Sequence, residues 1–339
     1  MTRGLRSVAV VGAGSWGTAL ARLLARKGHR VSLWAREPEV VQEIRELREN
    51  RTFLPGARVP DSLEVSSDLV EVVAGKPMVV SVVPSQFVGD VFGAMAGELD
   101  PAAQVVSASK GIEVSTGRRM DEVFSDILTD EQVHRLTFLS GPSFAAEVAE
   151  DVPTAVVVAS RSSQAALSAQ DAFQTEYFRV YTNPDVLGVE MAGALKNVVA
   201  LAAGAVAGME LGHNTLAALI TRGLAEITRL GVAMGADPAT FSGLAGMGDL
   251  VLTCTGALSR NRTVGYRIGK GESLAEILAS MKGVAEGVRT VQAVQDLARE
   301  AGVEMPISHE VHAILWEGKA ARDAIRDLML RVPRPEVWS

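Results

Sequence analysis

The chain has 339 residues, and its 40 acidic residues outnumber its 33 Lys and Arg residues, which gives a formal net charge of -7. Hydrophobic residues make up 47% and charged residues 22%, a balance that excludes disordered, collagen-like and disulfide-scaffold proteins. A pI near 5.4 argues against a nucleic-acid-binding protein held by bulk positive charge, so an anion site would have to be a local pocket. Because single cores stop growing at roughly 250–300 residues, the length predicts two domains.

The single cysteine, Cys254, cannot form an intramolecular disulfide, which favours a reducing compartment and a packing role for its thiol. The segment Met1 to Val11 lacks the apolar core of a signal peptide. The apolar run Val198 to Met209 is shorter than the about 20 residues that span a bilayer, and we expect it to form a buried helix. We therefore expect a cytoplasmic protein without an integral membrane segment.

Short Val-rich runs alternate with amphipathic segments from Val8 onward, as in repeated βαβ units. This pattern predicts an α/β, Rossmann-type region with a mostly parallel sheet. The predicted strands are Val8–Val11, Val31–Leu33, Met78–Val83, Gln104–Ala108, Thr137–Leu139, Pro153–Ala159 and Phe178–Tyr181. The charged segment Arg36 to Arg51 is predicted to be a solvated helix.

The pattern changes after Pro184, where strand signals stop and Ala, Leu and Gly stretches with helical spacing begin. Glycine-rich breaks are expected around Gly243–Gly248 and Gly283–Gly287. We predict two domains, an α/β domain over residues 1–184 and an all-helical domain over residues 185–339.

The run Gly12-Ala13-Gly14-Ser15-Trp16-Gly17 follows the first predicted strand and opens a helix. Such glycines permit a tight turn and close backbone approach to a pyrophosphate, and the helix N-terminus attracts the anion. The setting favours a dinucleotide site over an ordinary turn, so residues 1–184 are expected to bind NAD or NADP. The amides of Ser15 and Trp16 can reach phosphate, although Trp16 can equally serve packing.

The choice between NAD and NADP is made near the end of the second strand, which here continues into Arg36 and Glu37. The planar guanidinium of Arg36 suits a 2′-phosphate, whereas Glu37 suits ribose hydroxyls. A solvated ion pair at a helix start explains the two residues equally well, so the sequence leaves the preference open.

Ligands collect beyond the carboxyl ends of parallel strands, so polar residues just after strands are candidate site residues. Lys110 follows one strand, and Gly141 and Ser143 follow another. On local evidence alone, Ser143 reads as a helix N-cap and Lys110 can equally be a surface charge.

Lys196 is the most informative residue of the second half, because no other polar residue shares its face of the predicted helix. The neighbours at helical spacing are Val189, Ala192, Gly193, Val199, Ala200 and Ala203. Burial lowers the pKa of a lysine and makes it a proton donor and acceptor near neutral pH. The alternative is a lysine whose stem runs past small residues to water.

Three further groups are candidates in the helical region. Asp249 either caps a helix or pairs with Lys196, and Thr253 lies one turn later as a further donor. The run Ser259-Arg260-Asn261 carries donor types that suit a phosphate, or else forms an ordinary polar loop. The two histidines at 309 and 312 lack zincin spacing, so we expect no metal site.

Together these residues resemble one family across nearly the whole chain, the NAD(P)-dependent sn-glycerol-3-phosphate dehydrogenases of the bacterial type. The resemblance rests on seven ordered motifs, which are Gly12-Ala13-Gly14-Ser15-Trp16-Gly17, Ser109-Lys110-Gly111-Ile112-Glu113, Ser140-Gly141-Pro142-Ser143-Phe144-Ala145, Ala194-Leu195-Lys196-Asn197, Gly246-Met247-Gly248-Asp249-Leu250, Ser259-Arg260-Asn261 and Gly283-Val284-Ala285-Glu286-Gly287.

The resemblance implies two sets of site residues. Those that contact the dinucleotide are Ser15, Trp16, Arg36, Lys110, Ala145, Arg260, Val284 and Glu286. Those that contact substrate are Lys110, Gly141, Ser143, Lys196, Asp249, Ser259, Arg260 and Asn261, with Lys196 as the catalytic acid/base. It also implies a cytoplasmic homodimer that supplies glycerol 3-phosphate for membrane phospholipid synthesis.

On this basis we expect hydride transfer from NAD(P)H to C2 of dihydroxyacetone phosphate. Lys196 would protonate the developing alkoxide, Lys110 would stabilise it, and Asp249 would orient Lys196 with help from Thr253. Two alternatives remain, a β-hydroxyacid dehydrogenase with a similar domain order and a non-catalytic sensor of the NAD(P)H ratio.

Overall fold

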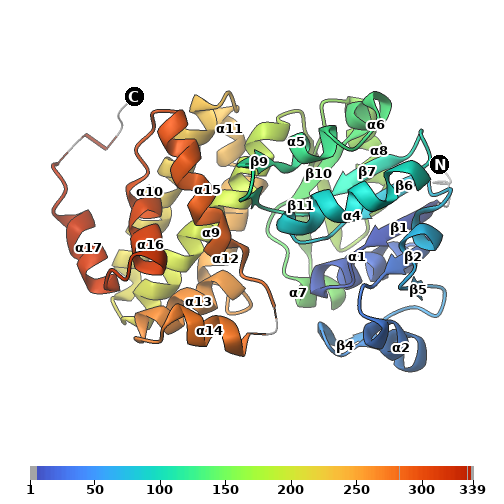
Figure 1. Cartoon of the computed structure of the whole chain (residues 1–339), viewed down its shortest axis with the longest axis horizontal. Coiled ribbons are helices and arrows are strands. Elements are labelled where there is room, and N and C mark those ends of the chain that lie inside the picture. The colour runs from blue at the N-terminus through green and yellow to red at the C-terminus, as the bar shows by residue number, and fades with distance from the viewer. Residues whose placement is uncertain (1–5, 282, 334, 337–339) are drawn as a thin grey trace.

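The computed structural model describes residues 6–281, 283–333 and 335–336. The first five residues of the segment Met1 to Val11 therefore lie outside the described residues. A sheet with covering helices forms one half of the molecule and a group of helices forms the other, and the two halves lie side by side (Figure 1).

The main sheet has eight strands in the order β12-β11-β10-β7-β6-β1-β2-β5. All neighbours are parallel except β10 and β11, which confirms a mostly parallel Rossmann-type sheet. Its strands are β1 (Ser7–Val11), β2 (Arg30–Trp34), β5 (Glu64–Ser66), β6 (Met78–Ser81), β7 (Gln104–Ser107), β10 (Thr137–Ser140), β11 (Thr154–Ala159) and β12 (Phe178–Asn183). The first six of these in chain order show the 3-2-1-4-5-6 arrangement of dinucleotide-binding sheets.

All seven predicted strands are present, and β5 is the strand that the sequence did not indicate. It has three residues, of which Val65 alone is buried, so it carries no apolar run. Two small ladders were also missed. They are formed by β3 (Glu49–Asn50) with β4 (Leu54–Arg58) and by β8 (Ile112–Glu113) with β9 (Arg118–Arg119).

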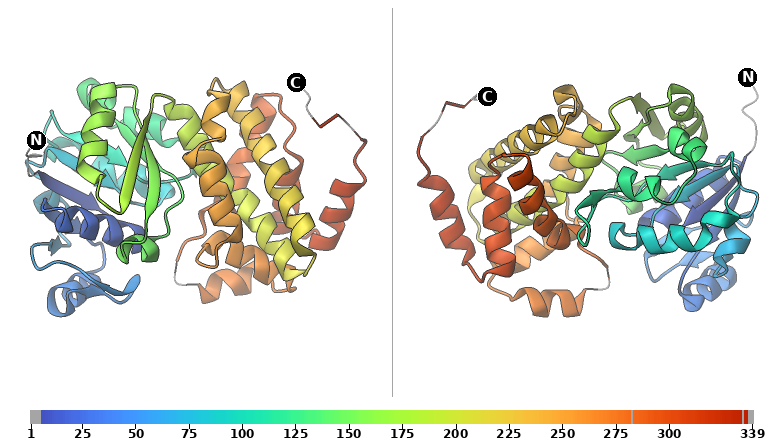
Figure 2. Two further views of the ribbon diagram at one scale, coloured as in Figure 1. Left: turned by 180° about the vertical axis from the view of Figure 1, so that it is seen from behind. Right: turned by 45° about the horizontal axis from the view of Figure 1, so that its top comes forward.

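Side chains alternate between the two faces of the sheet, and helices cover both faces (Figure 2). One face packs on α1 (Ser15–Arg26), α2 (Pro38–Leu47), α7 (Ala145–Ala149) and α8 (Ser163–Phe173). The other packs on α3 (Leu69–Val73), α4 (Val88–Met95), α5 (Met120–Ser125) and α6 (Asp130–Arg135). The short turns η1 (Ser85–Phe87) and η2 (Ala96–Glu98) come directly before and after α4 in the chain. The prediction of a solvated helix over Arg36 to Arg51 is wrong in part, because α2 is shorter and buries Val40, Val41 and Ile44.

Every regular element described after Asn183 is a helix, which confirms the predicted change in secondary structure. These are α9 (Val186–Gly208), α10 (Gly212–Ala233), α11 (Pro238–Phe241), η3 (Leu244–Gly248), α12 (Asp249–Thr255), α13 (Arg260–Gly269), α14 (Leu274–Ser280), α15 (Glu286–Glu300), α16 (Pro306–Trp316) and α17 (Ala321–Met329). The expected break at Gly243–Gly248 is smaller than predicted, since η3 is a π-helical turn that leads directly into α12. The second break ends earlier than predicted, because α15 begins at Glu286.

Helix α9 is the core of the helical half and packs on α10, α12, α13 and α15. A methyl group on Gly204 would lie 2.0 Å from the Arg262 carbonyl oxygen, so only glycine allows α13 to approach this closely. The buried cluster that contains α9 also contains Val11, Val105 and Phe138 of the sheet. A continuous apolar core therefore joins the two halves.

By length and hydropathy, α9 could cross a membrane, and Pro238–Thr255 with Arg260–Gly269 passes the same test as a bent pair. The apolar run that we expected to be buried lies in α9, and 83% of its most apolar window is buried inside the protein. This is the burial of a core helix.

Candidate active site

The three glycines of the turn differ in the space around them; Gly12 and Gly14 lie between β1 and α1, and Gly17 lies in the first turn of α1. Gly12 has φ +115°, and a methyl group there would lie 2.9 Å from the Val82 carbonyl oxygen. A methyl group on Gly17 would lie 1.8 Å from the Gly12 oxygen, whereas one on Gly14 would meet nothing within 4 Å. Gly12 and Gly17 thus permit the turn and its packing, and Gly14 leaves open space at the helix start.

The start of α1 also offers hydrogen-bond donors to an anion. Helix α1 begins at Ser15, its N-cap Gly14 forms no side-chain hydrogen bond, and its first turn carries no acidic residue. The free N–H groups and the positive end of the helix dipole are therefore available to an anion. Trp16 packs against the apolar core of this half, while its indole N–H has no partner among the described residues.

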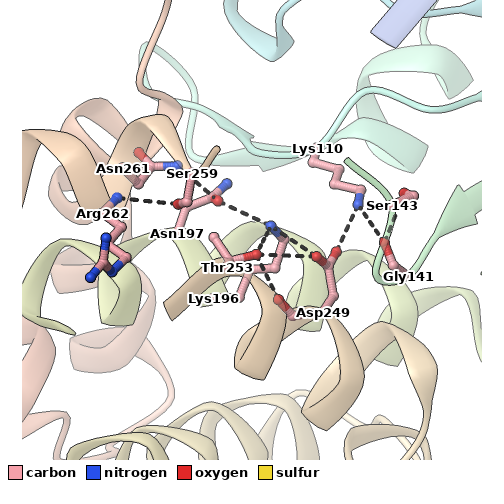
Figure 3. Close-up of polar contacts among 10 residues, drawn as sticks. All are labelled: Lys110, Gly141, Ser143, Lys196, Asn197, Asp249, Thr253, Ser259, Asn261 and Arg262. Carbon is pink, nitrogen blue, oxygen red and sulfur yellow. Dashed lines mark hydrogen bonds and ion pairs between the residues drawn. The ribbon is translucent and has the colours of Figure 1, made fainter. Parts of the chain in front are cut away.

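Lys196 of α9, Asp249 of α12 and Lys110 after β7 meet at the carboxyl end of the sheet (Figure 3). Asp249 Oδ1 lies 3.2 Å from Lys196 Nζ, and Asp249 Oδ2 lies 2.7 Å from Lys110 Nζ. The side chains of Lys196 and Asp249 are only 8% and 4% exposed. Lys196 therefore does not extend to water, and Asp249 pairs with it instead of capping a helix.

The electrostatics of this group favour an ionised Asp249 carboxylate and a Lys196 ammonium that holds its proton less tightly than a free lysine does. Burial lowers the pKa of Lys196, and the Lys110 cation lowers it further against the attraction of Asp249. Burial by itself would raise the pKa of Asp249, but Lys110 and Lys196 outweigh it and hold that pKa below its usual value. One carboxylate thus stands between two cations, and Glu286 is a further acidic group close enough to interact with Lys196.

Lys196 Nζ also donates to two neutral oxygens. One is Thr253 Oγ1 at 2.8 Å, and Thr253 in turn donates to the Asp249 carbonyl oxygen at 2.6 Å. The other is Asn197 Oδ1 at 3.2 Å, which Asn261 Nδ2 also approaches at 2.9 Å. The ammonium is therefore held from three directions.

Asn197 was not predicted as a site residue. Its position directly after Lys196 in the Ala194-Leu195-Lys196-Asn197 motif was the available signal. It links Lys196 to Asn261, whose own oxygen accepts the N–H of Gly287 at 3.0 Å. This chain of bonds connects α9, α13 and the start of α15.

The loop after β10 supplies backbone oxygen to the site. The Gly141 carbonyl accepts Lys110 Nζ at 3.3 Å and Ser143 Oγ at 3.0 Å. The N-cap prediction for Ser143 is wrong, because α7 is capped by Phe144 and the Ser143 hydroxyl bonds back to Gly141. Lys110, 17% exposed, is held by the site and is not a free surface charge.

The run Ser259-Arg260-Asn261 forms the start of α13. The Ser259 hydroxyl is buried and caps the helix by accepting from the Arg262 N–H at 3.2 Å. Arg260 is exposed, and within the described ranges no ion pair is recorded for it. Its guanidinium stands next to Gly283, where a methyl group would lie 2.9 Å from Arg260 Nη1.

Of the remaining candidates, Glu286 is close enough to Lys196 to interact with its charge. Glu286 is half-buried, accepts the Ser85 N–H at 3.3 Å, and has its pKa raised by desolvation. Val284 is 44% exposed, and Ala145 is half-buried at the start of α7. No recorded contact links Trp16, Arg36 or Arg260 to Lys196 or Asp249 in the described part of the chain, so the structure does not bring these three residues into the lysine group.

The sequence also raised the two histidines at 309 and 312 and the single cysteine. Within residues 6–281, 283–333 and 335–336, no cluster of three His, Cys, Asp or Glu side chains could hold a metal ion. His312 instead pairs with Glu317 at 3.0 Å. Cys254 is buried, and burial raises the pKa of its thiol to about 12, which disfavours the reactive thiolate.

A dinucleotide-type sheet with a glycine turn, facing a buried lysine on helices, defines a nicotinamide-dependent oxidoreductase. The family models described as "NAD-dependent glycerol-3-phosphate dehydrogenase N-terminus" and "C-terminus" match residues 7–166 and 185–326. The chain belongs to this NAD-dependent glycerol-3-phosphate dehydrogenase family.

Individual relatives agree with this membership. A protein of Citrifermentans bemidjiense named glycerol-3-phosphate dehydrogenase [NAD(P)+] is 57% identical over 96% of this chain and 97% of its own. One of the same name from Geobacter sulfurreducens is 54% identical over 98% of this chain and 99% of its own. The crystal structure of glycerol-3-phosphate dehydrogenase from Coxiella burnetii superposes with a TM-score of 0.92 at 39% identity, covering 96% of this chain and 99% of that chain.

Proposed function

We propose that this protein catalyses the NAD(P)H-dependent, reversible reduction of dihydroxyacetone phosphate to sn-glycerol 3-phosphate. The observation that carries the proposal is the buried Lys196, held by Asp249 and Thr253 at the carboxyl end of a dinucleotide-type sheet. The relatives named above carry the same activity in their names. Residues 1–184 are proposed to bind the cofactor and residues 185–339 to complete the substrate site.

The cofactor is proposed to lie across the glycine turn, where its pyrophosphate takes the space beside Gly14. When bound, NADPH or NADH supplies the hydride. The proposed set of cofactor-binding residues is Gly12, Gly14, Ser15, Trp16, Gly17, Arg36, Lys110, Ala145, Arg260, Val284 and Glu286. The open start of α1 and the unpartnered Trp16 indole N–H support the members of this set that lie in the glycine turn, residues 12–17.

The substrate phosphate is proposed to bind at the start of α13. Arg260 is exposed there and offers a planar set of donors, and the helix dipole adds to the attraction. Asn261 keeps one N–H beyond the one that it donates to Asn197. The full proposed set of substrate-binding residues is Lys110, Gly141, Ser143, Lys196, Asp249, Thr253, Ser259, Arg260 and Asn261.

Lys196 is proposed to transfer the proton. Its Nζ would donate to the oxygen on C2 as negative charge develops there, and Lys110 would stabilise the same oxygen electrostatically. Asp249, Thr253 and Asn197 take up the three N–H groups of the ammonium in this structure, so the substrate oxygen would replace one of these partners. The lowered pKa of Lys196 favours release of the proton in reduction and its recovery in the reverse reaction.

On the family resemblance we further propose a cytoplasmic homodimer whose product serves phospholipid synthesis. Light scattering coupled to gel filtration tests the dimer directly. A mass of one chain, 35.8 kDa, across micromolar concentrations would contradict it.

The decisive experiment follows the absorbance loss of NADPH, and then of NADH, with purified protein and dihydroxyacetone phosphate. Dihydroxyacetone without phosphate and a 3-oxo acid serve as controls. We expect oxidation that depends on the phosphate group. Binding of the cofactor without oxidation by the phosphorylated ketone would overturn the proposal in favour of a sensor, and oxidation with the 3-oxo acid would favour a hydroxyacid dehydrogenase.

A further inference from the structure

The segment after β2 is fixed in place by its backbone. Gly12 N–H donates to the Trp34 carbonyl at 3.1 Å, and Ala35 N–H donates to the Ser66 carbonyl at 3.0 Å. Glu37 is the N-cap of α2, and its carbonyl accepts the Val40 N–H at 3.0 Å. Residues 35–37 therefore follow β2 in a defined conformation, next to the strand that carries the glycine turn.

Arg36 and Glu37 form an ion pair on this segment. Arg36 Nη2 lies 2.7 Å from Glu37 Oε1, and Arg36 Nε lies 3.1 Å from the same oxygen. The Arg36 side chain is 73% exposed, and among the described residues Glu37 is its recorded ionic partner. An exposed pair of this kind contributes little to stability, so a ligand can break it at small cost.

The place of this pair matches the part of a dinucleotide that differs between NAD and NADP. In sheets of this type, the residue about 20 positions beyond the last glycine reads the adenosine ribose, and that residue here is Glu37. A carboxylate there accepts a ribose 2′-hydroxyl, whereas a guanidinium binds a 2′-phosphate. The chain thus carries both kinds of group, and they bind each other.

We propose that Glu37 sets the balance between NADPH and NADH by competing with the 2′-phosphate for the Arg36 guanidinium. This inference rests on the proposed function. With NADH, the Arg36–Glu37 pair stays intact or Glu37 accepts the 2′-hydroxyl. With NADPH, Arg36 turns to the phosphate and leaves a carboxylate beside it. The pair therefore favours use of both cofactors over a strong preference for NADPH.

Once Arg36 binds the 2′-phosphate, the Glu37 carboxylate and the phosphate repel each other, and this repulsion should weaken NADPH binding measurably. At a separation of about 6 Å in water, one carboxylate and a phosphate of about two charges repel each other enough to weaken binding roughly tenfold. Glu37→Gln should therefore raise NADPH affinity up to about tenfold and leave NADH affinity unchanged or lower. Because the pair is exposed, the gain should shrink at 0.5 M salt.

The test measures binding and not turnover. Dissociation constants of NADPH, NADH, adenosine 2′,5′-bisphosphate and 5′-AMP are determined by calorimetry for the wild type and for Glu37→Gln and Arg36→Gln. Glu39→Gln is the matched control, since Glu39 is exposed in the first turn of the same helix. We expect Glu37→Gln to strengthen only the two ligands with a 2′-phosphate and Arg36→Gln to weaken only these.

Each alternative result has a separate meaning. An equal change for phosphorylated and unphosphorylated ligands, or the same shift in Glu39→Gln, would overturn the role of Glu37 and leave the proposed function standing. If the wild type binds neither NADPH nor NADH, the proposed function fails first and this inference fails with it.

Discussion

The glycine turn of the sheet half and the lysine group of the helical half are built in different ways. The turn offers backbone N–H groups and open space, and its three glycines lie within six consecutive residues. The lysine group consists of side chains from α9 and α12 together with Lys110 after β7, brought together by burial. One part of the site is thus local in sequence and the other is assembled by tertiary packing.

This difference predicts which changes each part tolerates. A site made of backbone depends on the shape of the chain and is sensitive to an added methyl group. A site made of buried charges depends on which partners remain, because a lone buried charge is costly. Variants that change only the space around the backbone of the turn, or only the charged partners of the lysine group, therefore test this comparison.

The largest effect is expected from Lys196→Ala. Loss of a general acid typically costs about 10²–10⁴ in turnover, and the glycine turn, which makes no recorded contact with Lys196, should keep its cofactor affinity. Steady-state kinetics with dihydroxyacetone phosphate and a fluorescence titration with NADPH measure the two quantities. The control is Lys270→Ala, which removes an exposed lysine paired with Glu210 at 2.6 Å and should leave turnover unchanged.

The pH profile gives an independent check of Lys196. In the reduction direction, the rate should fall as pH rises through the lowered pKa of Lys196, because the proton donor is lost. In the reverse direction the rate should rise over the same range. Turnover within twofold of the wild type in Lys196→Ala would remove this residue from the mechanism.

Two glycine variants separate shape from binding within the turn. Gly17→Ala places a methyl group 1.8 Å from the Gly12 oxygen and should cost roughly 1–3 kcal/mol in unfolding free energy. Gly14→Ala meets nothing within 4 Å and should keep its stability. It should nevertheless bind NADPH about tenfold less tightly, a loss of about 1.4 kcal/mol, because the methyl group takes space proposed for the pyrophosphate. Equal stability of the two variants would contradict this division of roles.

Glu226 offers a test of buried charge away from the site. It is 3% exposed and accepts the N–H of Ile307 at 2.7 Å and of Ser308 at 3.3 Å. Burial raises its pKa from 4.5 to about 7, although the two backbone N–H groups oppose the shift. The folded state therefore binds the proton more tightly than the unfolded state does.

The sign of the pH dependence follows from this linkage. The contribution of Glu226 to stability is fully present below about pH 4.5 and is lost as pH rises to about 7, a difference of roughly 3 kcal/mol. Denaturant unfolding of the wild type and Glu226→Gln at pH 5 and pH 8 measures it. The wild type should lose more stability than the variant across this range, and parallel curves would show that Glu226 does not titrate there.

The smallest effect is expected from Thr253→Val, which removes one acceptor of Lys196 Nζ and leaves Asp249 in place. One hydrogen bond to a charged group corresponds to about tenfold in turnover. Thr255→Val is the matched control, since Thr255 lies on the same helix, donates to the Val251 carbonyl at 2.8 Å and is exposed. If both variants lose the same activity, the loss results from a change in helix α12 and not from the missing hydrogen bond to Lys196.

The sequence by itself determined the strands, the glycine turn and the candidate lysine, because each depends on a local pattern. Val-rich runs identified seven strands, and glycine spacing after the first identified the turn. Strand β5 escaped this reasoning because three residues carry too little periodicity. The local N-cap pattern was misleading at Ser143, whose hydroxyl bonds to Gly141 instead.

Only the tertiary structure decided how the charges are paired. Asp249 binds both Lys110 and Lys196, although these residues are far apart in the chain, and Asn197 links Lys196 to Asn261. Sequence spacing carries no information on such contacts, because they depend on how α9, α12 and α13 pack against one another and against the end of the sheet. The sequence thus predicted the chemical groups of the site. Their partners were determined by burial, because a buried polar group without water must bind a neighbouring protein group.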